Sequence, residues 1–222
     1  MKIKLYILAI ASILAFGSCE TDNYDAPGTM LEGHLMYQGK EVATKKAEMR
    51  IEVYEKGWDF EKEIEMKVDQ NGHYSETLFD GSYKLFLKNG RGSFSNFTSS
   101  DTIHFELNGN QQLDIEVEPF FFVNEPNYSV SGSTLTATVK VDKVVTEKQI
   151  GKVKLLVGKT MLVDDQYKEI DVTLEEIADL SNITLTADIS DLVSKGYCFA
   201  RVAVGTEGVS TYNYSFVKKL DL

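Results

Sequence analysis

The stretch EIEMKVDQNGHYSETLFDGSYKLFL, residues 63–87, decides the fold class. Every second residue from 64 to 68 is apolar and the neighbours between them are charged, which is the period-two pattern of a half-buried β-strand. Asn71-Gly72 and Asp80-Gly81 follow, and both dipeptides favour the positive backbone angles of tight hairpin turns. We therefore predict one strand before the first turn and two more strands over residues 73–87, joined at the second turn.

The same alternation recurs along the rest of the chain and predicts an all-β protein made of antiparallel strands. One segment, residues 173–180, departs from it: Thr173 and Glu176 have the spacing of a capping box, which predicts one short helix. The clearest strand patterns lie at residues 31–37, 113–117, 135–141 and 183–187, with an almost wholly apolar run at 153–157.

A proline-bracketed connector divides the chain into two domains. Pro119 cannot donate a ladder hydrogen bond, and with Pro126 it flanks an aromatic run at 120–122. We expect this run, together with Tyr128, to pack the joint between the domains. The predicted organisation is a signal peptide at 1–18, a lipidated cysteine and flexible tether at 19–28, and two β-sandwich domains at 29–119 and 120–222.

The amino terminus has the layout of an export signal. Lys2 and Lys4 precede an apolar run at 5–16, followed by Gly17-Ser18 and Cys19. As a helix, this run would cover about 18 Å, well short of the roughly 30 Å of a bilayer's hydrocarbon core. The residues before Cys19 resemble a bacterial lipobox, which implies acylation of Cys19 and a stable membrane anchor. The alternative is an ordinary secretory signal with an incidental cysteine.

The net charge, the cysteines and the histidines argue against several classes of function. The chain carries 23 basic and 34 acidic residues, a net charge of -11 that becomes -13 once Lys2 and Lys4 leave with the signal, and this argues against a nucleic-acid partner. Cys198 lies in an apolar run and is expected to be a small buried side chain rather than a nucleophile. The three histidines are widely spaced, so we expect no metal site and no cofactor. They are His34, His73 and His104.

Two stretches resemble known architectures. In the first half, Gly33-His34-Leu35, residues 68–74 and residues 80–85 resemble the transthyretin-like domain related to the carboxypeptidase regulatory module. In the second half, residues 191–197 and the strand at 199–202 resemble the end of an immunoglobulin-like or fibronectin type III sandwich. The resemblances imply an N-terminal transthyretin-like and a C-terminal immunoglobulin/fibronectin III-like domain.

Together with the lipobox, these features resemble a two-domain Bacteroidetes lipoprotein family of undefined function. Its members usually accompany starch-utilisation-type glycan uptake systems, so the resemblance implies an outer-membrane lipoprotein at the cell surface, with a periplasm-facing position as the alternative. The implied partners are the membrane through the lipid, a polysaccharide or oligosaccharide, and a TonB-dependent transporter complex. The family carries no established catalytic residues that map onto this chain.

Sugar binding needs exposed aromatic rings with amide and carboxylate groups beside them. One candidate cluster is Tyr54, Trp58 and Phe60, where strand alternation stops. The other is Arg91, Phe94 and Phe97 in a glycine-rich segment that predicts a long, mobile loop. For both clusters the alternative is packing in the core.

We expect no enzymatic activity, because the chain has no nucleophile elbow, phosphate loop or metal motif. The prediction is a non-catalytic accessory of glycan uptake. A structural, fimbria-like subunit matured by proteolysis is the alternative, with Lys45-Lys46 as a weak candidate cleavage site. A hydrolase is the third possibility and requires two carboxylates about 5 to 10 Å apart in a groove.

Overall fold

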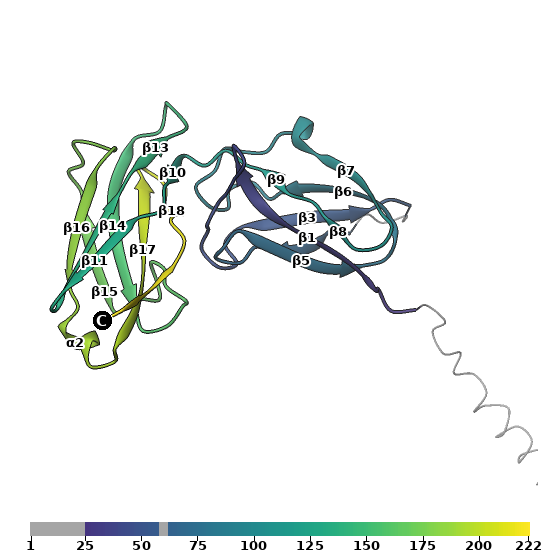
Figure 1. Cartoon of the computed structure of the whole chain (residues 1–222). Helices are drawn as coiled ribbons and strands as arrows, with labels where there is room; N and C mark the ends of the chain where they lie inside the picture. Colours follow the sequence, from purple (N-terminus) through teal and green to yellow (C-terminus); the bar gives the residue numbers. More distant parts are fainter. Residues whose placement is uncertain (1–24, 58–61) are drawn as a thin grey trace, which may run out of the picture.

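The computed structural model describes residues 25–57 and 62–222, and these residues form two lobes built almost entirely of β-strands (Figure 1). The first lobe ends at β9 and the second begins at β10. Each lobe has its own hydrophobic core between packed sheets. The predicted all-β fold with two sandwich-like domains is therefore confirmed. Within the described ranges, no helix is both long enough and apolar enough to cross a bilayer.

Two facing sheets form the first lobe. One has the order β2-β1-β5, and the other has the order β4-β3-β6-β7. Their inward side chains, such as Leu35, Ile51 and Leu85, are fully buried, as the alternation predicts. The elements are β1 (Thr29–Tyr37), β2 (Lys40–Glu41), β3 (Arg50–Glu55), β4 (Ile64–Lys67), β5 (His73–Leu78), β6 (Gly81–Leu87), the 3-10 helix η1 (Ser99–Asp101), β7 (Ile103–Leu107), β8 (Gln111–Gln112) and β9 (Ile115–Glu116).

The two predicted hairpins are wrong, although their strands are present. β5 pairs with β1, whereas β4 and β6 both pair with β3, so the turns at Asn71-Gly72 and Asp80-Gly81 carry the chain from one sheet to the other. The Asp69 carboxylate accepts the backbone N–H groups of Asn71 and His73, which closes the first turn locally. The residues of these turns therefore determine where the chain bends but not which strand the next strand pairs with.

A second departure from the expected antiparallel fold lies beside β1. β8 and β9 pair with β1 in parallel, at Leu31 with Gln111 and at Leu35 with Ile115. Parallel neighbours need a long crossover connection. Here the crossover consists of the whole chain from β2 to β7, because the segment after β7 returns to the opposite sheet and runs along β1.

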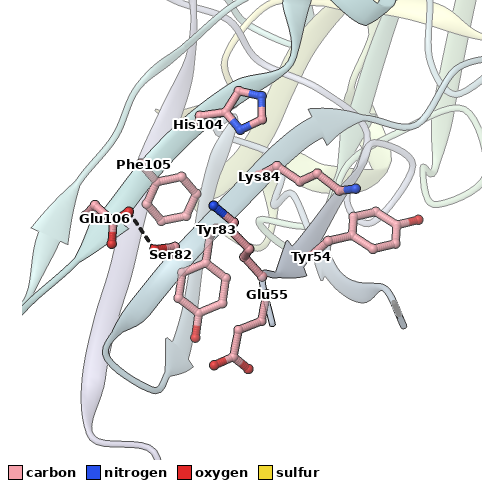
Figure 2. Close-up of a pocket in the computed structure, with 9 residues that line it drawn as sticks. Tyr54, Glu55, Ser82, Tyr83, Lys84, His104, Phe105 and Glu106 are labelled. Atoms are coloured by element: carbon pink, nitrogen blue, oxygen red, sulfur yellow. Dashed lines mark hydrogen bonds between the residues drawn. The ribbon is translucent and has the colours of Figure 1, made fainter. Parts of the chain in front are cut away.

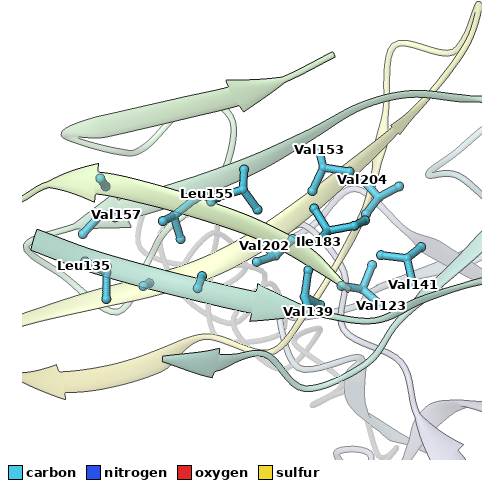
Figure 3. Close-up of a cluster of buried hydrophobic side chains, with 14 of the residues drawn as sticks. Val123, Leu135, Val139, Val141, Val153, Leu155, Val157, Ile183, Val202 and Val204 are labelled. Atoms are coloured by element: carbon cyan, nitrogen blue, oxygen red, sulfur yellow. The ribbon is translucent and has the colours of Figure 1, made fainter. Parts of the chain in front are cut away.

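The second lobe encloses a larger core (Figure 3), in which Leu135, Val153, Val202 and the free cysteine Cys198 are fully buried. Its sheets are β11-β12-β16, β15-β14-β17-β18 with β19 also on β17, and the pair β10-β13. The elements are β10 (Phe121–Val123), β11 (Asn127–Ser131), β12 (Thr134–Val139), β13 (Val141–Lys143), β14 (Ile150–Gly158), β15 (Ile170–Leu174), β16 (Ile183–Asp188), the helix α2 (Ser190–Val193), β17 (Tyr197–Thr206), β18 (Tyr212–Tyr214) and β19 (Lys218–Asp221).

The predicted helix at 173–180 is wrong. Thr173 and Leu174 belong to β15, which pairs with β14, and the residues after them form an irregular loop. A short capping-box pattern contributes little free energy by itself, and the ladder with β14 outweighs it. The short helix of this lobe, α2, lies further along the chain.

The connector between the lobes packs as expected. Phe121 is almost fully buried in the core of the second lobe, whereas Phe122 packs against the core of the first and lies 5.5 Å from the Tyr37 ring. Asn213 of β18 joins the lobes further, because its amide donates to the Ser93 carbonyl and its side-chain oxygen accepts the N–H of Phe121. Side chains of the connector thus belong to both cores.

A buried arginine holds the same joint. Arg201 has no exposed surface and lies 4.2 Å from the centre of the Tyr214 ring. Its guanidinium donates to the carbonyls of Ser215 and Val163 in the second lobe and to the carbonyl of Thr44 in the first. Burial lowers the pKa of Arg201 to about 10, so the side chain remains charged at neutral pH.

Candidate functional site

The candidate site is the outer face of the sheet β4-β3-β6-β7 in the first lobe. Side chains alternate across this sheet, so the residues between the buried core positions point away from the lobe. Unlike a purely solvating surface, this face carries aromatic rings next to hydroxyl, amide and charged groups. Its outward residues include Glu52 and Tyr54 of β3, Ser82, Lys84 and Phe86 of β6, and His104 and Glu106 of β7.

The first hollow on this face has a volume of about 550 Å³ and is lined by residues of β3, β6 and β7 (Figure 2). Figure 2 shows Tyr54 and Lys84 side by side, and the lysine Nζ lies 5.1 Å from the centre of the tyrosine ring. The Ser82 hydroxyl donates to Glu106 at 2.5 Å, and His104 is exposed beside them. An aromatic ring, a hydroxyl and a carboxylate therefore converge at one opening.

An aromatic stack forms the boundary of this hollow. The rings of Tyr54 and Phe86 are stacked, with centroids 5.5 Å apart and planes 18° from parallel. The Tyr54 hydroxyl donates to Glu52, a carboxylate that also accepts Lys88 at 2.8 Å. Partial burial and the nearby Glu52 charge raise the pKa of Tyr54, so the phenol remains a donor at neutral pH. Both rings are half-buried, which leaves part of each ring surface accessible.

A second hollow, of about 320 Å³, lies beyond Phe86 and reaches Phe97. Asn89 holds the backbone of Phe97 at both groups: its amide donates to the Phe97 carbonyl at 2.7 Å, and its oxygen accepts the Phe97 N–H at 2.6 Å. The hydroxyl-bearing residues Thr98, Ser99 and Thr102 complete the lining. Phe97 is thus fixed at the edge of the sheet by a side-chain clamp.

A third hollow, of about 580 Å³, lies on the other side of Phe97. Its lining combines Tyr37 and Asn96 with three carboxylates. Glu116 accepts the N–H of Gln38, Glu118 accepts the Ser95 hydroxyl, and Asp101 accepts groups of Thr98. Those hydrogen bonds from Thr98 hold the pKa of Asp101 below its usual range.

The structure brings together only part of the predicted candidates. Tyr54 lines the first hollow and Phe97 lines the second and third. Trp58, Phe60 and the lipidation candidate Cys19 lie outside the described residues.

The other two candidates are not part of this face. Phe94 is buried in the first core and bridges to Pro119, so its proposed role in ligand binding is corrected to packing. Arg91 is exposed but lines none of the three hollows. The loop that carries Arg91 and Phe94 is attached to the second lobe, because the fully buried Ser93 forms hydrogen bonds with Thr211 and Asn213.

Phe86 was not among the predicted residues, although the sequence contained a signal for it. Tyr83, Leu85 and Leu87 alternate as buried positions, which places Phe86 on the opposite face among polar neighbours. A single aromatic residue on a polar face is ordinary, but Phe86 adjoins the Tyr54 ring, and a contiguous apolar patch rimmed by polar groups is typical of interaction sites. His104, for which the sequence predicted only that it takes part in no metal site, lines the first hollow.

Other reactive side chains have structural surroundings. Asp165 accepts Lys45 at 2.7 Å and the Tyr214 hydroxyl at 2.6 Å, while Asp164 caps the N–H groups of Gln166 and Tyr167. Burial raises the pKa of the Cys198 thiol, which keeps it protonated. In the described part of the chain, no group of three His, Cys, Asp or Glu side chains is placed to hold a metal ion.

Fold and site together define a two-domain, all-β protein with an open, aromatic-lined sheet face on its first domain. Family comparisons agree with this division. A family model described as the N-terminal domain of a protein of unknown function (DUF3823) matches residues 29–118, and the model DUF3823_C, a domain of unknown function, matches residues 121–219. The chain belongs to the DUF3823 family.

Solved structures show the same fold. A DUF3823 protein from Bacteroides ovatus is 31% identical, with a TM-score of 0.82 over 88% of this chain and 100% of its own. One from Parabacteroides merdae is 29% identical, with a TM-score of 0.81 over 89% and 100%. A Bacteroides uniformis protein described as a "putative carbohydrate binding protein" is 19% identical, with a TM-score of 0.70 over 89% and 100%. Among curated proteins, none shows significant similarity to this chain.

Proposed function

We propose that this protein is a non-catalytic carbohydrate-binding accessory of a glycan uptake system, held at the outer membrane by a lipid on Cys19. The binding surface is the outer face of the sheet β4-β3-β6-β7. The observation that carries the proposal is the stacked pair Tyr54 and Phe86, half-exposed on a polar face beside hydroxyl and carboxylate groups. Sugar rings pack their apolar faces on such aromatic rings, while their hydroxyls bond to polar groups around them.

Two further observations support this choice. The similar Bacteroides uniformis structure is described as a "putative carbohydrate binding protein", which is compatible with a sugar ligand for this fold. In addition, the first two hollows are open to solvent on the sheet face and the third is open at its edge, where β1 and β9 of the opposite sheet contribute. Open hollows suit a polymer lying along the protein better than a reaction needing water exclusion.

The carboxylates favour binding over hydrolysis. A general acid in a glycosidase needs a raised pKa. Glu48 has such a pKa, about 7, but it lies at the joint between the lobes and lines none of the three hollows. In the third hollow, the carboxyl pKa of Asp101 is instead lowered.

The fimbria-like alternative has less support. Lys45, part of the candidate cleavage site, is half-buried and paired with Asp165 of the second lobe. A protease would have to cut at the joint between the domains, next to the buried Thr44 whose carbonyl accepts Arg201.

The test is titration calorimetry with soluble starch, xylan, mixed-linkage β-glucan and galactomannan. We expect one of these neutral polysaccharides to bind, and Tyr54→Ala or Phe86→Ala to weaken it about two- to tenfold, since an aromatic contact contributes roughly 0.5–1.5 kcal/mol. Phe79→Ala is the matched control, because Phe79 is 43% exposed in the turn between β5 and β6 and lines none of the hollows.

The outcomes separate clearly. Weaker binding by both face variants, with unchanged binding by the control, supports the proposal. If no polysaccharide binds, or if the control weakens binding as much as Tyr54→Ala does, sugar binding at this face is wrong. Mass spectrometry of the protein from its native membrane checks the anchor separately, and an unmodified Cys19 would remove that part of the proposal.

A further inference from the structure

The three hollows of the first lobe lie next to one another. Tyr54 lines the first hollow and stacks on Phe86, which lines the second. Phe97 lines both the second and the third. Each boundary between neighbouring hollows is thus an aromatic side chain, and this arrangement goes beyond what a single sugar ring requires.

Residues 101–106, which lead into and include part of β7, line all three hollows from alternating sides of the backbone. Asp101 and Ile103 line the third, Thr102 the second, and His104 and Glu106 the first. At about 3.3 Å per residue, the backbone from Thr102 to Glu106 alone spans about 13 Å. This distance exceeds the size of one sugar ring, so the path offers contacts to several consecutive units.

The charges along the path discriminate between types of chain. The lining contains six carboxylates against three lysines and one histidine. The imbalance is greatest in the third hollow, whose lining contains Asp101, Glu116 and Glu118 and no basic side chain. A uronic-acid or sulfated polymer would be repelled there, since like charges close together raise the free energy of the complex.

We propose that the three hollows form one continuous binding path for an extended, uncharged polysaccharide chain, with Tyr54, Phe86 and Phe97 as platforms for successive sugar units. This inference rests on the proposed carbohydrate binding and specifies its ligand as the interior of a neutral chain, rather than a free sugar or a chain end. Binding then strengthens with chain length, because each added unit reaches a further platform without a new cost of association.

Calorimetry with three oligosaccharide series tests the path. The probes are malto-, xylo- and cello-oligosaccharides, each from disaccharide to octasaccharide, with polygalacturonate and chondroitin sulfate as anionic polymers. For the series that binds, we expect affinity to rise at least about tenfold from the shortest to the longest member. The anionic polymers should bind more weakly than the neutral octasaccharide at low salt, where charge repulsion is strongest.

Variants of Tyr54 and Phe97, the two outermost of the three aromatic platforms, test whether one sugar chain contacts both. Tyr54→Ala and Phe97→Ala should each weaken the octasaccharide about two- to tenfold, whereas the disaccharide should respond to only one of them. Phe79→Ala again serves as the control. Because Phe97 also packs against the core, its variant is first checked for unchanged thermal unfolding, and Asn96→Ala replaces it if the fold is lost.

Each failure has its own meaning. Equal affinity for disaccharide and octasaccharide, or an effect of Tyr54→Ala alone, overturns the continuous path while leaving sugar binding intact. If polygalacturonate or chondroitin sulfate binds more tightly than the neutral octasaccharide, the proposal that the ligand is an uncharged chain is wrong. Absence of heat with every oligosaccharide and with the four polysaccharides removes the proposed function itself.

Discussion

Glu48 is a titrating residue at the joint between the lobes. Burial raises its pKa to about 7, the neighbouring Asp165 and Asp164 act in the same direction, and Lys45 acts against them. In the unfolded chain the pKa of this carboxyl lies near its ordinary value of 4.5. Between these two values the folded state binds more protons than the unfolded state. The free energy of unfolding therefore falls as the pH rises through this window.

Glu48→Gln should remove this pH dependence. We expect the variant to be more stable than the natural protein at pH 8 and similar to it at pH 5, because the amide carries no charge to desolvate. Urea unfolding at the two pH values measures the difference. Glu175→Gln, at an exposed position after β15, is the control and should leave the pH dependence unchanged. A Glu48→Gln profile parallel to that of the natural protein would contradict the assignment.

At the scale of elements, the turn between β4 and β5 is defined by close packing as well as by backbone angle. Gly72 has a φ of 77°, and a Cβ there would lie 2.1 Å from the Val42 carbonyl oxygen. Gly109, in the turn between β7 and β8, has a φ of 78° with nothing within 4 Å of the same position. The two glycines therefore share a left-handed backbone conformation, which glycine adopts without strain, and differ in the space beside them.

This pair allows a matched test. Gly109→Ala should cost about 1–2 kcal/mol, the usual cost of a left-handed conformation for an L-residue. Gly72→Ala should cost more, about 3 kcal/mol or above, because the Val42 backbone must also move. Urea denaturation gives both values, with an unchanged m-value as evidence that folding remains two-state. If both variants lose the same free energy of unfolding, the Val42 backbone moves aside at no measurable cost in free energy.

At the scale of the whole molecule, Arg201 couples the lobes. Its donors satisfy buried carbonyls on both sides of the joint, at Thr44 in the first lobe and at Val163 and Ser215 in the second. An arginine fork serves several acceptors at fixed angles, which a lysine does not reproduce. Each lobe nevertheless retains its own core without this residue.

Arg201→Met should consequently uncouple the lobes. We expect a loss of about 3 kcal/mol from carbonyls left without donors, together with thermal unfolding that separates into two transitions. Differential scanning calorimetry measures both effects. Lys67→Met, at an exposed position of β4, is the control and should change stability by less than about 0.5 kcal/mol. A single, unshifted transition in the Arg201 variant would show that other contacts carry the coupling.

Most strands and their inward side chains could be predicted from the sequence, because alternation is a local property of each strand; the exception is the end of β15, which was predicted as a helix. Tyr54 was predicted as a candidate because it lies near the point where strand alternation ends, and Phe97 because it lies in a glycine-rich segment with amides and an arginine. The alternation of β6 also predicts that Phe86 faces outward. Its place in a binding surface follows only from the stacking of its ring on Tyr54 of the neighbouring strand.

The pairing of the strands and the position of the site depend on contacts between residues far apart in the sequence. Asn71-Gly72 and Asp80-Gly81 set a sharp bend, yet the sheet that each following strand joins depends on partners far away in the sequence. The parallel pairing along β1 and the contacts of Arg201 are non-local in the same way. The binding face combines β3, β6, β7 and the Phe97 segment, and its geometry exists only once the core beneath has ordered them.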